Sequence, residues 1–342
     1  MSLNEISVLS YDQPSKIWNI EWSPDGKLLA SCGDDKTIHI WMEESENKWV
    51  VLQKLEAHEK TVRRIAWSPD GKYLAAASFD ASTSIWEVNN GEFNHISTLE
   101  GHSFEVKSVA WDASGQLLAT CSRDKSIWIW QMEDDQDFEC ISINNGHSQD
   151  VKCVRWHPSL EILASASYDD TIKMWQDTDG DWECIDTLSA HESTIWDIQF
   201  NASGNRLVSC SDDRSVCFWR LDSTTGRWKL LSRLESVHSR PIFSVDWSHN
   251  QELSPTEQLI CTGGGDDSII IYHQKQQQQQ QQSDSSSSSS TTPNEIEQYE
   301  ILYKHEKAHK SDINSIRWNP KKPNILASSG DDSTIKIWSF VC

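Results

Sequence analysis

Histidine and aspartate recur at regular positions along this chain, and together they could perform acid–base chemistry. Six copies of a repeated stretch carry a His four residues before an apolar segment: His58, His102, His147, His191, His238 and His309. Seven copies carry an Asp six residues before a closing aromatic residue: Asp35, Asp80, Asp124, Asp169, Asp213, Asp266 and Asp332. A catalytic pair is needed once, whereas this pair occurs six times. We therefore interpret these residues as structural and the protein as a non-enzyme.

The same counting argues against a metal site. Residues separated by a whole repeat should lie in different structural units, too far apart to share one ion. The nine Cys show no paired CxxC spacing, and Cys32, Cys121 and Cys210 hold the same place in three copies. They are predicted to be small core residues of a reduced, intracellular protein. No glycine-rich phosphate loop or nucleophile elbow occurs, so we expect no metal and no cofactor.

The closing aromatic residues define the repeat: Trp41, Trp86, Trp130, Trp175, Trp219, Tyr272 and Trp338. The first five are spaced by 45, 44, 45 and 44 residues, and the last two gaps, 53 and 66 residues, contain insertions. Within one copy, short β-compatible segments at 151–156, 163–167 and 171–175 alternate with polar turns. A further strand is expected after each of the first six copies. Self-similarity at this period indicates a repeat architecture.

The pattern resembles the WD-repeat (WD40) family, whose repeats start with Gly-His and end with Trp-Asp. Gly-His is present at 101–102 and 146–147, and the residue after the closing Trp varies. The resemblance implies an all-β, seven-bladed WD40 β-propeller with four strands per blade. It also implies a buried hydrogen-bonded network in each blade, formed in the third copy by His102, Ser122, Asp124 and Trp130.

Residues 1–342 are expected to form a single propeller domain. Only four residues follow Trp338, too few for an outer strand, so segment 4–10 is predicted to complete the last blade and close the ring. Insertions interrupt the sixth copy at 249–258 and 274–298. The second contains seven consecutive Gln and six consecutive Ser, which predicts a disordered loop inside the domain.

The net charge is −22, from 30 basic and 52 acidic residues. This balance argues against nucleic acid or an anionic membrane as the general partner. No apolar run reaches the roughly 18 residues that would indicate a membrane span, and the N-terminal residues do not read as a signal peptide. Proteins are therefore the expected partners.

In a propeller of this kind, two register positions in each copy should lie on the face usually called the top. They are the second residue of the first strand and the residue before the turn Asp. The basic and aromatic residues among them gather in copies one to five and form the predicted binding patch: Arg123, Arg63, Lys107, Lys152, Phe79, Tyr168, Trp196 and Trp18. Arg and aromatic residues are enriched at binding hot spots. The alternative is that the patch pairs with Glu105, Asp150 and Asp212 and merely seals the ring.

Segments 77–86, 99–102, 105–111, 118–126, 164–171 and 191–196 are similar to the WD-repeat proteins of cytosolic iron–sulfur protein assembly. The resemblance implies a scaffold of the targeting complex that inserts iron–sulfur clusters into cytosolic and nuclear apo-proteins. Its partners would be a small acidic adaptor, a large helical-repeat scaffold and the apo-protein clients, with this chain as a monomer in the hetero-complex. The family's top-face Arg corresponds to Arg123. The implied location is the cytoplasm, with the nucleus left open.

Two other classes of adaptor remain as alternatives. Substrate receptors of cullin-type ubiquitin ligases usually carry Trp-Asp-x-Arg, whereas this chain has Trp-Glu-Val-Asn at 86–89 and Trp-Gln-Asp-Thr at 175–178. A histone-tail reader would need an acidic channel mouth, and the predicted patch is basic. Some iron–sulfur relatives carry Leu-Tyr-Arg as a cochaperone-docking motif, and here residues 174–176 are Met-Trp-Gln.

Overall fold

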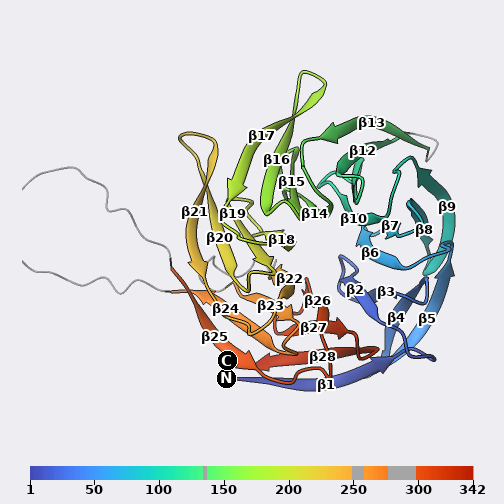
Figure 1. Cartoon of the computed structure of the whole chain (residues 1–342). Coiled ribbons are helices and arrows are strands. Elements are labelled where there is room, and N and C mark those ends of the chain that lie inside the picture. The colour runs from blue at the N-terminus through green and yellow to red at the C-terminus, as the bar shows by residue number, and fades with distance from the viewer. Residues whose placement is uncertain (134–136, 249–257, 276–297, 342) are drawn as a thin grey trace, which may run out of the picture.

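The computed structural model describes residues 1–133, 137–248, 258–275 and 298–341. Their regular structure is entirely β, arranged as seven four-stranded antiparallel sheets around a ring (Figure 1). The predicted seven-bladed propeller is therefore confirmed. The described part of the chain holds no helix long and apolar enough to cross a membrane.

Each blade is numbered by its place in the chain, and its strands run from the channel outward. Blades one and two contain β2 (Ile17–Trp22), β3 (Leu28–Gly33), β4 (Thr37–Ser45), β5 (Lys48–Glu56), β6 (Val62–Trp67), β7 (Tyr73–Ser78), β8 (Ser82–Asn89) and β9 (Glu92–Glu100). Blades three and four contain β10 (Val106–Trp111), β11 (Leu117–Ser122), β12 (Ser126–Met132), β13 (Phe138–Asn145), β14 (Val151–Trp156), β15 (Ile162–Ser167), β16 (Thr171–Thr178) and β17 (Asp181–Ser189).

The remaining blades repeat this order. Blades five and six contain β18 (Ile195–Phe200), β19 (Arg206–Ser211), β20 (Val216–Asp222), β21 (Arg227–Leu234), β22 (Ile242–Trp247), β23 (Ile260–Gly264), β24 (Ile269–Gln274) and β25 (Tyr299–His305). Blade seven contains β26 (Ile313–Trp318), β27 (Ile325–Gly330), β28 (Thr334–Val341) and, as its outer strand, β1 (Ser2–Ser10).

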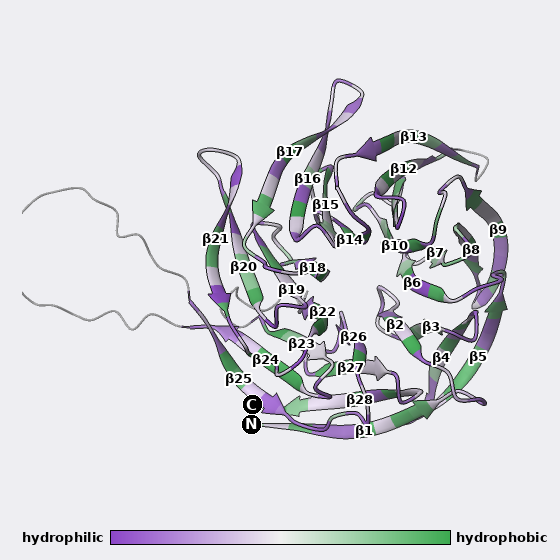
Figure 2. Ribbon diagram, in the orientation of Figure 1, coloured by the Kyte–Doolittle hydropathy of each residue, from purple (hydrophilic) through white to green (hydrophobic). Residues whose placement is uncertain are grey.

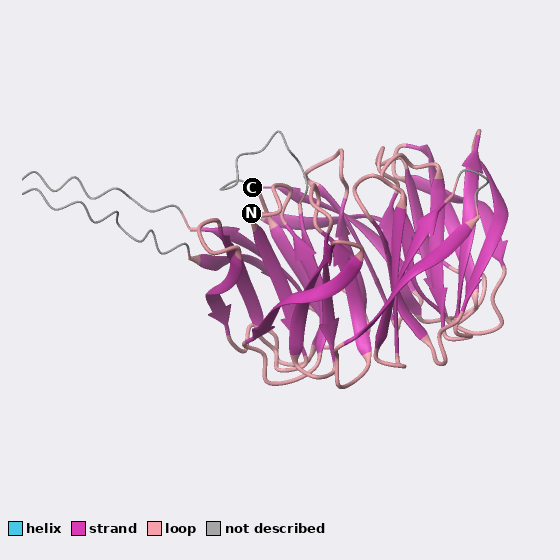
Figure 3. Cartoon of the chain, turned by 90° about the horizontal axis from the view of Figure 1, so that it is seen from above, coloured by secondary structure: helices cyan, strands magenta, loops and turns pink. Residues whose placement is uncertain are grey.

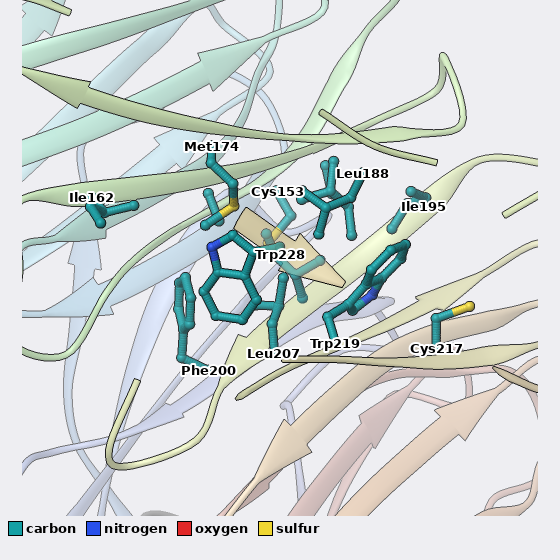
Figure 4. Close-up of a cluster of buried hydrophobic side chains, with 14 residues drawn as sticks. Cys153, Ile162, Met174, Leu188, Ile195, Phe200, Leu207, Cys217, Trp219 and Trp228 are labelled. Carbon is teal, nitrogen blue, oxygen red and sulfur yellow. The ribbon is translucent and has the colours of Figure 1, made fainter. Parts of the chain in front are cut away.

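The core lies between neighbouring blades rather than at one centre. Each apolar cluster joins residues of two adjacent blades, because the inner three strands are apolar on both faces of the sheet. Figure 4 shows the cluster between blades four and five, where Met174 and Leu188 lie near Phe200, Leu207 and Trp219. Figure 2 shows hydrophobic segments along the strands and hydrophilic loops, and Figure 3 shows those loops on both faces of the ring.

The N-terminal strand closes the ring, as the sequence predicts. Strand β1 pairs antiparallel with β28, with Leu3 opposite Phe340 and Leu9 opposite Ile335. The chain ends lie side by side in Figure 1. Leu3 is buried in the core toward blade six and Leu9 in the core toward blade one, so one strand supports both neighbouring interfaces.

Both predicted insertions lie largely outside the described residues. The segment expected at 249–258 is described only at Gln258, which is buried. For the Gln/Ser-rich segment expected at 274–298, Gln274 instead ends β24, and the amide of Lys275 donates to the carbonyl of Gln298 at 2.7 Å. The disorder predicted for the rest stays a prediction.

Deleting residues 1–10 should destabilise the protein and cause aggregation, because blade seven would lose its outer strand and expose an unpaired edge. Leu9→Ala should lower the free energy of unfolding by about 2–5 kcal/mol, the range for buried leucines. Val8→Ala is the matched control, because Val8 is 52% exposed and Leu9 is 4% exposed. Denaturant titration and light scattering measure both effects. A truncated protein that stays monomeric with an unchanged melting curve would contradict the closure argument.

Candidate functional site

The repeated His and Asp residues form buried hydrogen-bond networks that hold the turns. In blade four, His147 Nδ1 lies 2.8 Å from Asp169 Oδ2, and His147 Nε2 lies 2.7 Å from Ser165 Oγ. The indole of Trp175 donates to the same hydroxyl at 2.8 Å. Blades three, five, six and seven have the same arrangement, with a Thr hydroxyl in two of them and Tyr272 as the closing residue of blade six.

These networks do not suit acid–base catalysis. Burial alone would raise the pKa of the Asp169 carboxyl, but hydrogen bonds from His147 and Thr171 hold that pKa well below its usual value. The turn carboxylates of blades two, three, five and seven behave in the same way, and the pKa of Asp266 in blade six is lowered to about 2. A carboxylate with so low a pKa is a weak base, so the groups serve to fix the turns.

The sequence interpretation named the wrong hydroxyl in blade three. His102 Nε2 lies 2.9 Å from Thr120 Oγ1, and the Trp130 indole donates to that same oxygen at 3.0 Å. Ser122, which was predicted to fill this role, donates instead to the carbonyl of Phe104 at 3.1 Å and accepts from the amide of Asp124. Ser122 lies at the end of β11 and therefore reaches the turn rather than the closing Trp.

Blades one and two build the same network from different residues. In blade two the second-strand position is Ala76, and the hydroxyl comes from Ser84, which lies directly opposite on β8. In blade one, which lacks the repeated His, the hydroxyl of Tyr11 lies 2.9 Å from Ser31 Oγ. His39 lies 2.7 Å from Asp35 and stacks on Tyr11, with 3.8 Å between ring centroids.

The second residue of every inner strand, one of the two predicted top-face positions, occupies a β-bulge. Phe79, Arg123 and Tyr168, at the other predicted position, lie in the turn after the second strand of their blades. The pairing register shifts across the second residue of each inner strand, so that this residue has no direct partner on the next strand. The bulged residues are Trp18, Arg63, Lys107, Lys152, Trp196, Phe243 and Asn314. Bulges re-aim side chains without disturbing the rest of a ladder. The fold thus frees these positions to vary between blades.

Cations and aromatic rings alternate along this rim. The guanidinium of Arg63 lies 4.9 Å from the ring centre of Trp18, and Lys107 Nζ lies 4.0 Å from that of Phe79. Lys152 Nζ lies 5.2 Å from both the Tyr168 and Trp196 rings. Contacts of this kind are worth about 0.5–2 kcal/mol each. We call the eight predicted residues (18, 63, 79, 107, 123, 152, 168 and 196) the top-face patch.

The three acids that could pair with the patch and seal the ring, Glu105, Asp150 and Asp212, form such contacts to different degrees. Arg123 Nη1 donates to Glu105 at 3.1 Å, and Lys152 Nζ lies 3.3 Å from Asp150. Asp212 pairs with no cation of the described residues, and its carboxylate accepts from the Trp196 indole at 2.5 Å. Arg123 and Tyr168 both remain 55% exposed despite these contacts, counting the side chain of Arg123 and the whole residue of Tyr168. The patch is thus partly paired and partly available to a partner.

The cations crowd one another electrostatically. The pKa of Lys107 is lowered to about 8, chiefly by burial and also by the charges of Lys152 and Arg63, against a raising effect of Glu105. A partner carboxylate near Lys107 would relieve this repulsion and restore full protonation. The rim is therefore suited to an acidic segment.

Sequence reasoning missed a second layer of residues, one step deeper in the channel. The third residues of the inner strands vary as much as the second: Asn19, Arg64, Ser108, Cys153, Asp197, Ser244 and Ser315. Asp197 Oδ1 accepts from Arg64 at 2.7 Å, and its Oδ2 lies 3.2 Å from Arg317 Nη2, with all three side chains buried. The variation of these third residues between copies could have indicated this layer from the sequence. Among the described residues, no group of three His, Cys, Asp or Glu is placed to hold a metal ion.

Comparison with known proteins agrees with this geometry. The family described as "WD domain, G-beta repeat" matches seven segments: 5–42, 49–87, 93–131, 138–176, 182–220, 228–273 and 300–339. The chain is 60% identical over 95% of its length, and 92% of the relative, to the "Probable cytosolic iron-sulfur protein assembly protein CIAO1 homolog" of Dictyostelium discoideum. It is 42% identical to the corresponding "Ciao1" protein of Aedes aegypti, over 95% of this chain and 94% of that one.

These matches define the class first: a WD40-repeat propeller, a fold that is typically non-catalytic. Within that class, the chain belongs to the family of the cytosolic iron–sulfur protein assembly protein CIAO1. The resemblance noted from the sequence is thereby confirmed. The printed names of these relatives place them in cytosolic iron–sulfur protein assembly.

Ser84→Ala should destabilise the protein by about 1–3 kcal/mol, because two buried nitrogens, His58 Nε2 and Trp86 Nε1, would lose their shared hydroxyl. Ala76→Ser added to Ser84→Ala should recover most of that loss. The new hydroxyl would stand on the second strand, where the other blades carry theirs. Denaturant titration of both variants and of Ala76→Ser alone measures the coupling. A double variant no more stable than Ser84→Ala would refute the exchange of hydroxyls across the ladder.

Proposed function

We propose that the protein is a non-catalytic scaffold of the cytosolic iron–sulfur protein assembly machinery. It binds partner subunits and apo-protein clients through the top-face patch, acting as a monomer within a hetero-complex. The clusters are then inserted into cytosolic and nuclear clients by the complex. Identity of 60% to a CIAO1 homolog along nearly the whole chain is the observation that carries this proposal.

The geometry of the top-face patch supports protein binding in particular. Arg side chains grip carboxylates in bidentate fashion, and aromatic rings add apolar contact area beside them. The net charge of the chain is −22, yet the second-position residues of blades one to five are all cationic or Trp. The patch would therefore attract an acidic segment while the rest of the surface repels it, which favours a defined orientation.

The structure suits the ubiquitin-ligase alternative less well. Such a receptor would use Trp-Asp-x-Arg after the third strand, and here Glu87 and Gln176 follow Trp86 and Trp175 on β8 and β16. The histone-reader alternative needs acids at the top mouth, where blades two to four instead supply Arg63, Lys107 and Lys152. We therefore retain the assembly scaffold as the proposal.

Arg123→Glu should weaken binding of the partner or client by at least about 2 kcal/mol, the scale of a hot spot, while leaving the melting temperature nearly unchanged. The guanidinium is 55% exposed and the fold does not need it, because other blades place Asp, Phe, Tyr or Gly there. Affinity purification with quantitative mass spectrometry, in parallel with thermal melting, measures both properties.

Arg240→Glu is the matched control for this experiment. Arg240 precedes the inner strand of blade six, whereas Arg123 lies in the turn after β11. Like Arg123, it is an exposed Arg with one carboxylate partner: its side chain is 60% exposed, and it pairs with Asp312 at 3.3 Å, much as Arg123 pairs with Glu105. Asp124→Ala should behave in the opposite way, lowering stability by about 1–3 kcal/mol through loss of the His102 network. If Arg123→Glu unfolds the protein, or captures the same partners as Arg240→Glu, the top-face proposal fails.

A further inference from the structure

The bottom half of the channel contains a cavity that the proposed function does not use. Its volume is about 260 Å³, and it is lined by the fifth and sixth residues of the inner strands and by Pro24 and Pro320 in the bottom turns. The sixth residues supply a belt of indoles: Trp22, Trp67, Trp111, Trp156 and Trp318. The buried ion pair of Asp197 and Arg64 lies at the third residues, between this cavity and the top-face patch. The two sites are therefore separate.

The fifth residues make one side of the cavity roomy and cationic. Blades two and three contribute only Ala66 and Ala110, and the next blade contributes Arg155. Its guanidinium side chain is 11% exposed, and its nearest acid is Asp197, with 3.8 Å between Nη2 and Oδ1. Arg155 Nε is buried with no hydrogen-bond partner among the described residues. A buried guanidinium with an unmatched donor usually needs an acceptor.

The acids near Arg155 are already committed elsewhere. Asp197 accepts from Arg64 and lies against Arg317, and Glu21 accepts from Arg317 Nε at 3.1 Å. Asp246 accepts from the Gln199 amide at 2.9 Å and from the backbone amide of Trp318 at 2.7 Å. Burial lowers the pKa of Arg155, and the neighbouring charges of Arg64 and Arg317 lower it further. An added carboxylate would offset this unfavourable field.

We propose that this cavity binds a small aromatic carboxylate, with the carboxylate on Arg155 and the flat ring over Ala66 and Ala110, between the indoles of Trp67 and Trp111. Planar guanidinium groups match carboxylates in two parallel hydrogen bonds. Aromatic walls favour a flat apolar body, and the volume is just below the usual range of roughly 300–1,000 Å³ for small-molecule sites. A ligand of one or two fused rings therefore fits.

The probe is 2-naphthoate, and its neutral counterpart is 2-naphthamide. Isothermal titration of the full chain with each compound should give saturable binding of 2-naphthoate, at least tenfold tighter than that of the amide. Arg155→Gln should weaken 2-naphthoate binding at least tenfold. Ala110→Leu, which fills the cavity and keeps every charge, should weaken it similarly. Arg123→Gln, on the opposite face, should change it less than twofold.

Melting temperatures show whether each variant is folded, and either Arg155→Gln or Ala110→Leu suffices for the test if the other fails to fold. Equal binding of acid and amide, or undiminished binding by a folded cavity variant, would overturn the proposal. So would loss of a protein partner in Arg155→Gln pull-downs without any 2-naphthoate binding by the unmodified chain, because the cavity would then serve a partner. None of these outcomes measures partner binding through Arg123, so the top-face proposal is judged separately.

Discussion

One buried carboxylate, Asp197, holds five of the seven blades together at the axis. From blade five it bonds to Arg64 of blade two at 2.7 Å, to Ser244 of blade six at 3.1 Å and to Arg317 of blade seven at 3.2 Å. The Cys153 thiol of blade four lies 3.3 Å away. Burial would raise the pKa of Asp197, but Arg64 and Arg317 hold it far below its usual value. Removing one partner of such a buried set typically costs about 3–5 kcal/mol, so the ring depends on all of them.

The layered channel separates the residues that make the fold from those free to change. Third residues of the inner strands bond to the neighbouring blade, as when Asn19 of blade one accepts from the Ile65 amide of blade two at 3.0 Å. Sixth residues bond to the preceding blade, as when the Trp67 indole donates to the Glu21 carbonyl at 3.3 Å. Second residues are bulged and have no cross-strand partner to satisfy. The rim residues that determine binding specificity can therefore change with little effect on the free energy of unfolding.

Much of the fold could be predicted from the sequence, because comparing the seven copies shows which positions are constant and which vary. Seven copies predicted seven blades, the missing outer strand predicted closure by the N-terminus, and the register located the rim. The hydrogen-bond partners within a blade were harder to predict. In blade two the hydroxyl comes from Ser84 on the third strand rather than from Ala76, its partner on the second strand, and the sequence does not show this pairing. Close approach was also hidden: a Cβ at Gly101 would lie 2.2 Å from Trp128, and one at Gly146 would lie 2.6 Å from Trp175. A side chain at either position would therefore collide with an indole in this structure.

The rim itself is not uniform, and its differences suggest how it would bind. Trp18 is fixed by a hydrogen bond of 2.6 Å from its indole to Asp34, and Asp34 also accepts from Thr61 at 3.0 Å. Arg63 stacks on this fixed ring, so much of its conformational entropy is lost before any partner arrives. Arg123 is instead exposed and held by one carboxylate. Preordered side chains lower the entropic cost of association, and an exposed charge can exchange its partner. Trp18 and Arg63 are thus held in place before binding, and Arg123 is the residue that can release Glu105 for an incoming acid.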